Sequence, residues 1–182
     1  LLDKYAKERD PELRALDQER MKNSRWFKGN DLLGVLMYTN CFAGDLKGVE
    51  QKIPYLKECG FNYLHLMPIL ESPKEKSDGG YAVSNFHKVQ PELGTMDDLK
   101  SLSVCHEEGI SVCLDFVMNH CSEEHEWVKR AKNGEQEFQD RFFMFNDWGL
   151  PNEFERTVPQ VFPESAPGNF TYCEEAKKVV MT

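Results

Sequence analysis

The sequence has no apolar run that approaches the roughly 18 residues a membrane-spanning helix needs. It also has no excess of basic residues, and its net charge is −9 at pH 7. That charge argues against a nucleic acid or an anionic membrane as the partner and is compatible with a neutral ligand such as a sugar. With 40% hydrophobic and 29% charged residues, the chain has enough apolar material for a real core.

Motifs for several common chemistries are also missing. None of the six cysteines forms a Cys-x-x-Cys pair, so we expect no structural zinc site and no disulfide framework. His120, Cys121 and His125 lie close together, but their spacing matches no common metal site. No nucleophile elbow and no phosphate-binding glycine loop is present. The sequence therefore predicts neither a metal nor a cofactor.

The start of the chain has helical character. Asp10 can cap a helix that begins at Pro11, with Leu13, Leu16 and Met21 along one face. We interpret residues 1–28 as the tail of a helical N-terminal region. Since the first residue is not Met and no signal peptide follows, we expect an excised piece of a longer protein, in which a missing targeting sequence says little about compartment. The expected location is cytoplasmic.

Three short apolar runs then alternate with amphipathic segments. The runs at residues 32–38, 61–67 and 110–117 are typical of strands that are buried on both faces. Helices are predicted near 46–59, with Pro54 as a kink and Gly60 as the stop, and near 96–108, with Thr95 as the cap and Gly109 as the stop. This alternation predicts an α/β protein with a parallel sheet. Cys59, Cys105 and Cys113 lie in these segments and are interpreted as small core residues.

The regular alternation ends after residue 117. Residues 69–90 are predicted to be a long loop, residues 123–132 a helix, and residues 178–181 the start of another strand. Between the last two lies an irregular stretch rich in aromatic residues, which is typical of an inserted subdomain or a functional loop. We therefore divide the chain into a helical tail (1–28), an α/β domain (29–122) and an inserted subdomain (123–182).

Candidate site residues follow the second and third predicted strands, where parallel α/β folds place their active sites. Asp115 interrupts an apolar strand and needs a local partner, and Asn119 and His120 follow it. Asp78 lies in an Asp-Gly-Gly turn, where its carboxylate could hold two hydroxyls, and the ring of Tyr81 could stack on a sugar ring. From the residues alone, a structural role for Asp115 and a plain turn at Asp78 are equally good or better interpretations.

Together these segments resemble glycoside hydrolase family 13, the α-amylase family, and within it the amylosucrase branch. The matching segments are Phe-Ala-Gly-Asp-Leu-Lys-Gly at 42–48, Tyr-Leu-His-Leu-Met-Pro at 63–68, Ser-Asp-Gly-Gly-Tyr-Ala-Val at 77–83, Leu-Gly-Thr at 93–95 with Asp98-Leu99, and 115–120 with His-Glu-Trp at 125–127. The Asp-x-x-x-Asn-His block at 115–120 is specific to the wider family, and the segments at 63–68 and 77–81 indicate the branch. Phe162-Pro163 and Pro167-Gly168 fit the family's inserted loop domain.

The resemblance implies the first three strands of a (β/α)8 TIM barrel. It also implies that Asp78 holds hydroxyls of the attacked glucose, that Tyr81 stacks on its ring, and that His120 hydrogen-bonds it. Asp115 would support the site from the strand end, and Asn119 would hold the loop geometry. The family carries its nucleophile, its acid/base and a third carboxylate on the fourth, fifth and seventh strands. We therefore expect no catalytic residue in this chain and no activity from it alone.

The resulting functional hypothesis is an amylosucrase-like glucosyltransferase that takes glucose from sucrose by a retaining mechanism and builds α-1,4-glucan. Its partners would be these sugars, and the oligomeric state is not indicated. Two alternatives stay open: a sucrose or α-glucoside hydrolase or isomerase with the same site, and a non-catalytic amylase-like binding or scaffold protein.

Overall fold

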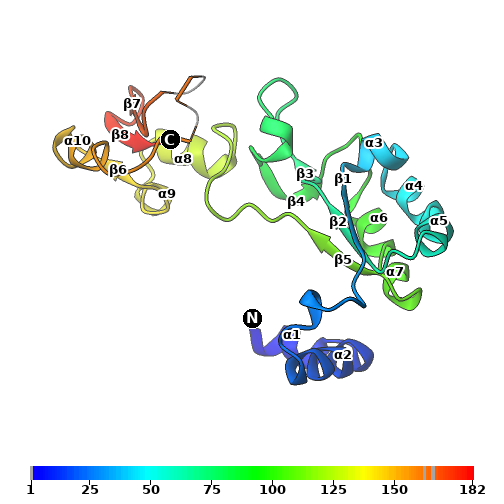
Figure 1. Ribbon diagram of the computed structural model, residues 1–182. Coiled ribbons are helices and arrows are strands. Elements are labelled where there is room, and N and C mark those ends of the chain that lie inside the picture. The colour runs from blue at the N-terminus through cyan, green and yellow to red at the C-terminus, as the bar shows by residue number, and fades with distance from the viewer. Residues whose placement is uncertain (1, 162, 165–166) are drawn as a thin grey trace. The chain divides into compact units, whose positions relative to one another are not determined.

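The computed structural model describes residues 2–161, 163–164 and 167–182, which form two compact units (Figure 1). The first unit comprises Leu1–Ile69 and Glu92–Asp115, and the second comprises Leu70–Pro91 and Phe116–Thr182. Phe162, on which the Phe162-Pro163 match partly rests, lies outside the described residues. The expected three-part division of the chain stays a prediction.

The first unit is built on a three-stranded parallel sheet. Its strands are β1 (Gly34–Met37), β2 (Tyr63–Leu66) and β5 (Ser111–Leu114), in the order β1-β2-β5. Leu36 lies opposite His65, which in turn lies opposite Cys113. The prediction of an α/β fold with three parallel strands is confirmed, and the arrangement is consistent with part of a TIM barrel.

Short helices connect these strands: α3 (Thr39–Ala43), α4 (Leu46–Gln51), α5 (Ile53–Glu58), α6 (Met96–Ser101) and α7 (Val104–Glu107). The helix expected at 46–59 is divided at Lys52, and Pro54 lies in the first turn of α5, where its missing N–H costs no hydrogen bond. Thr95 caps α6 as predicted, and the structure shows a capping box with Asp98. The helices end at Gly60 and Gly109, whose φ angles of 81° and 78° suit glycine.

The core of the first unit lies between one face of the sheet and the helices (Figure 1). The members of this core with no exposed surface are Leu46, Val49, Leu56, Leu64, Leu66 and Cys105. The interpretation of Cys59 as a core residue is wrong, because it follows the last turn of α5 and is exposed, whereas Cys113 is half-buried. The opposite face of the sheet carries His65 and Leu36, and Leu36 is 57% exposed.

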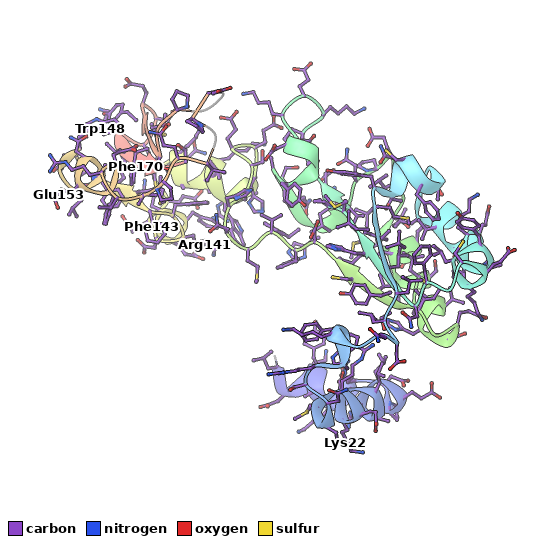
Figure 2. The ribbon with its side chains drawn as sticks, in the orientation of Figure 1. Lys22, Arg141, Phe143, Trp148, Glu153 and Phe170 are labelled. Atoms are coloured by element: carbon purple, nitrogen blue, oxygen red, sulfur yellow. The ribbon has the colours of Figure 1, made fainter. Side chains whose placement is uncertain are left out.

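The N-terminal segment forms α1 (Leu2–Glu8), α2 (Pro11–Lys22) and the 3-10 turn η1 (Trp26–Lys28). Asp10 Oδ1 accepts the backbone N–H of Glu12 at 2.8 Å, which confirms the predicted cap. The guanidinium of Arg20 donates to Ser111 Oγ at 2.6 Å and so connects α2 to the start of β5. Lys22, at the end of α2, points away from the rest of the helix pair (Figure 2).

The second unit begins with an antiparallel pair, β3 (Leu70–Glu71) and β4 (Asn85–Val89). The prediction of a continuous loop over 69–90 is therefore wrong. The two strands pair over only two residues, which leaves no periodic pattern in the sequence. A side-chain contact is added next to the pair, where the N–H of Ser72 donates to Gln90 Oε1 at 2.8 Å. The turn η2 (Asp78–Gly80) lies between the two strands.

The rest of the second unit is α8 (Glu126–Lys132), α9 (Gln136–Gln139), α10 (Gly149–Phe154) and an antiparallel sheet in the order β6-β8-β7. Its strands are β6 (Met144–Phe145), β7 (Phe170–Cys173) and β8 (Lys178–Met181). The helix and the last strand agree with the sequence-based expectation, whereas the stretch expected to be irregular contains this small sheet. Phe145, Phe154 and Phe170 pack with ring centroids 5.9–6.3 Å apart, and Figure 2 shows Phe170 among these elements. Across the described residues, no helix has the length and apolarity to cross a membrane.

Candidate functional site

The turn that carries Asp78 has an unusual backbone. Asp78, Gly79 and Gly80 have positive φ angles of 49°, 66° and 95° in succession, a conformation that two glycines permit at low cost. The N–H of Tyr81 donates to the carbonyl of Asp78 at 3.1 Å, and the N–H of Ala82 donates to that of Ser77 at 2.9 Å. These backbone hydrogen bonds are therefore made within the turn itself. The side chain of Asp78 is exposed to solvent.

The segment after β5 carries the other candidates. Asn119 and His120 are exposed, and Asn119 Nδ2 lies 3.5 Å from His120 Nδ1. Next to them, the N–H of Ser122 donates to the carbonyl of Val83 at 2.9 Å. The segment with His120 is thereby hydrogen-bonded to the segment that follows Tyr81.

An ion pair connects the same two segments on the outside. Lys76 Nζ lies 2.7 Å from Glu123 Oε1. Their hydrogen bond raises the pKa of Lys76 and lowers that of Glu123, so both stay charged at neutral pH. Because both side chains are largely exposed, the pair adds little stability, and the backbone bond between Ser122 and Val83 is the firmer link.

Asp115 has the local partner that its position required. Its Oδ1 lies 3.0 Å from His65 Nε2, across the register of β2 and β5, and both side chains are about three-quarters buried. Its backbone N–H also continues the ladder of the sheet by donating to Leu66 at 3.4 Å. His65 therefore holds the carboxylate at the point where the strand becomes the segment that carries His120.

The role of His65 is not apparent from the pattern of its strand. The only available signal was a histidine in an otherwise apolar run, and nothing in the sequence indicates which of its neighbours it would contact. Asp115 belongs to the first unit, whereas Asp78, Tyr81, Asn119 and His120 belong to the second. We predict from the strand ends that Asp78, Tyr81, Asp115 and His120 converge at one end of the sheet, and this convergence stays a prediction.

The candidate residues of the second unit, Asp78, Tyr81 and His120, have side chains that suit a polyhydroxylated ligand. A carboxylate accepts hydrogen bonds from two hydroxyls, an aromatic ring offers an apolar face, and an imidazole can donate to or accept from another hydroxyl. His125, whose nearness to His120 and Cys121 raised the question of a metal ligand, instead uses Nδ1 to accept the backbone N–H of Trp127 at 3.1 Å. Within the described part of the chain, no cluster of three metal-ligating side chains is present.

Comparison with protein families decides the classification. Residues 17–176 match the model for the alpha-amylase catalytic domain. The chain belongs to the alpha-amylase family. This membership agrees with glycoside hydrolase family 13, which the motifs indicated.

Curated relatives of this alpha-amylase-family chain include glucosidases. Maltase 1 of Drosophila virilis is 38% identical over 136 residues, which is 74% of this chain and 20% of that protein. Oligo-1,6-glucosidase IMA5 of Saccharomyces cerevisiae is 37% identical over 123 residues, or 67% of this chain and 20% of that protein. The chain thus spans about a fifth of the length of these relatives.

Solved structures agree on the fold. A trehalose-6-phosphate hydrolase of Bacillus licheniformis matches with a TM-score of 0.69 at 25% identity, over 86% of this chain and 28% of that chain. A sucrose complex of the MutB E254Q mutant matches with a TM-score of 0.68 at 24% identity, over 83% of this chain and 28% of that chain. At that identity the second match supports the fold alone.

The contact between His65 and Asp115 can be measured by a double-mutant cycle in the full-length protein. We expect His65→Ala and Asp115→Ala each to lower the free energy of unfolding, and the two effects to couple by about 0.5–3 kcal/mol, because each change removes the same contact. Urea unfolding of the two single variants and the double variant measures the coupling. Strictly additive effects would show that the two side chains do not stabilise one another.

Proposed function

We propose that the protein containing this chain processes α-glucosides by a retaining mechanism, as a hydrolase or an isomerase. The observation that carries the proposal is the hydrogen bond between Ser122 and Val83, which ties the segment with His120 to the segment with Tyr81 in a chain of the alpha-amylase family. Acting from these two segments, Asp78, Tyr81 and His120 bind one glucose unit.

Each residue contributes a different interaction in this proposal. Asp78 accepts hydrogen bonds from two hydroxyls, Tyr81 stacks on the apolar face of the ring, and His120 hydrogen-bonds a further hydroxyl. Asn119 holds the geometry of its segment, and Asp115, paired with His65, supports the site from the end of β5. The nucleophile and the acid/base that cleave the glycosidic bond are carboxyl groups on later strands of the barrel.

The names of the curated relatives favour hydrolysis over glucan synthesis. They include a maltase and an oligo-1,6-glucosidase among the curated proteins. The amylosucrase-like alternative is based on the segments at 63–68 and 77–81, and these two relatives do not support it specifically.

Product analysis separates these activities. Full-length protein is incubated with maltose, isomaltose, trehalose and sucrose, and the products are followed by chromatography and proton NMR. We expect glucose release or an isomeric disaccharide, and the first glucose formed should be the α anomer, because two displacements retain configuration. Fructose release with a growing glucan would support the amylosucrase-like alternative. No turnover of any of the four sugars would favour the scaffold alternative.

A further inference from the structure

His125 is the most heavily constrained histidine of the second unit. Its side chain is 6% exposed, and its ring lies 5.5 Å from that of Phe86 on β4 and 4.9 Å from that of Trp127 on α8, between centroids. Its backbone N–H donates to the carbonyl of Ser122 at 3.0 Å. One residue thereby contacts β4, α8 and the segment that carries His120.

The hydrogen bond to α8 defines the protonation state of this ring. Nδ1 of His125 accepts the N–H of Trp127 at the first turn of α8, in the position where Ser, Thr, Asp or Asn usually caps a helix. An imidazole nitrogen that accepts a hydrogen bond carries no proton, so the neutral ring has its proton on Nε2. A protonated ring loses this acceptor and adds a positive charge at a helix N-terminus, where cations are unfavourable.

The same ring lies next to the links between the two proposed sugar-binding segments. Ser122, whose carbonyl accepts the N–H of His125, donates its own N–H to Val83. Phe86, which contacts His125, also contacts Phe116 at 5.6 Å between centroids. The segment with His120 is therefore held at its two ends, by Phe116 and by the region of Ser122 and His125, against the chain that follows Tyr81.

We propose that His125 is a positioning residue: its neutral imidazole caps α8 and holds the segment with His120 against the segment with Tyr81, and its protonation releases that segment. The positioning role of His125 is argued from contacts within the second unit. The effect of that role on sugar binding rests on the proposed function.

The charges around His125 agree with a neutral ring. Burial lowers its pKa below the usual histidine value of about 6.5, the adjacent carboxylate of Glu126 opposes that shift, and His87 on β4 adds to it. On the far side, the guanidinium of Arg141 lies 4.5 Å from the ring centroid of Trp127. Because the pKa is lower in the folded state, the stabilisation is present above about pH 6.5 and is lost as the pH falls through the folded pKa.

Two substitutions in the full-length protein separate the cap from the charge. His125→Asn keeps a capping side chain that does not titrate, whereas His125→Ala removes the cap. At pH 7 we expect His125→Ala to raise KM about tenfold, a change of the size that a lost cap permits, and His125→Asn to stay within about twofold of the wild type. As the pH falls from 7 to 5, kcat/KM of His125→Asn should rise relative to the wild type. His106→Ala, an exposed histidine on α7, serves as the matched control.

Two further measurements do not depend on turnover. Nitrogen NMR of labelled histidine should show the Nε2–H form of His125 at neutral pH, and amide hydrogen exchange across 116–125 should speed up in His125→Ala and, after correction for intrinsic rates, in the wild type at low pH. A proton on Nδ1 at pH 7, or unchanged exchange in His125→Ala, would overturn the positioning role. If exchange changes but none of the four sugars is turned over, only the proposed function fails. Unchanged KM in an active His125→Ala variant would also overturn the role.

Discussion

Replacing His120 by alanine in the full-length protein is expected to lower kcat/KM for α-glucoside cleavage by about a hundredfold. The reason is that the proposed hydrogen bond from His120 to the sugar strengthens as charge develops on the glucose in the transition state. His120 is exposed in the chain, so its removal creates no cavity, and the melting temperature should change little. Initial rates with the preferred sugar, measured together with thermal unfolding, test both statements.

The control for this experiment is His106→Ala, because His106 is also exposed but lies on α7, in the first unit. It should leave kcat/KM unchanged. If His120→Ala turned over the sugar as fast as the control variant, His120 would have no place among the sugar-binding residues. A loss of activity that followed a loss of folded protein would assign it a structural role instead.

The second large effect concerns the 182-residue polypeptide by itself, which we expect to have no glycosidase or transferase activity. Retaining cleavage needs two carboxyl groups about 5–5.5 Å apart, one as nucleophile and one as acid. The candidate site offers Asp78 and Asp115, which we assign to binding and support. A complete barrel also requires about 250 residues. Incubation with sucrose or maltose should release no glucose or fructose above a control without protein.

The same polypeptide is expected to self-associate. Leu36, Phe116 and Met118 are 57%, 60% and 85% exposed, and among the described residues no strand pairs with the outer edges of β1 and β5. Light scattering during purification measures this tendency.

Clear sugar turnover by the isolated polypeptide that disappears in Asp78→Ala or Asp115→Ala would contradict the expected lack of activity and would assign one of these acids as the nucleophile.

Much of the candidate site was accessible from the sequence because its residues lie in short contiguous motifs. Asp78 and Tyr81 share one turn, and Asp115, Asn119 and His120 share one strand end, so each group forms a block that the family resemblance could assign to the site. The need of Asp115 for a partner also followed from the cost of burying a carboxylate. Its identity did not, because His65 is 50 residues away in the chain and becomes a neighbour only through the pairing of β2 with β5.

The capping role of His125 was missed for a related reason. Histidine is an unusual helix cap, so the sequence pattern offered a metal ligand as the more familiar alternative. Only the fold shows Nδ1 directed at the N–H of Trp127 and the ring buried against Phe86. The role of a side chain such as His125, which has several possible partners, becomes clear only from its neighbours in the folded chain.

Most of the local structure of the first unit follows from its sequence. Apolar runs produced the parallel strands, Thr95 and Asp10 began helices, and Gly60 and Gly109 ended them, because each depends on residues within about one turn of the chain. The tertiary structure was needed to reveal the β3–β4 pair and the pairing of β8 with β6 and β7. β3 and β6 are two residues long, too short for a periodic signal, and these pairs form because distant segments, such as Met144 and Val180, satisfy one another's backbone groups.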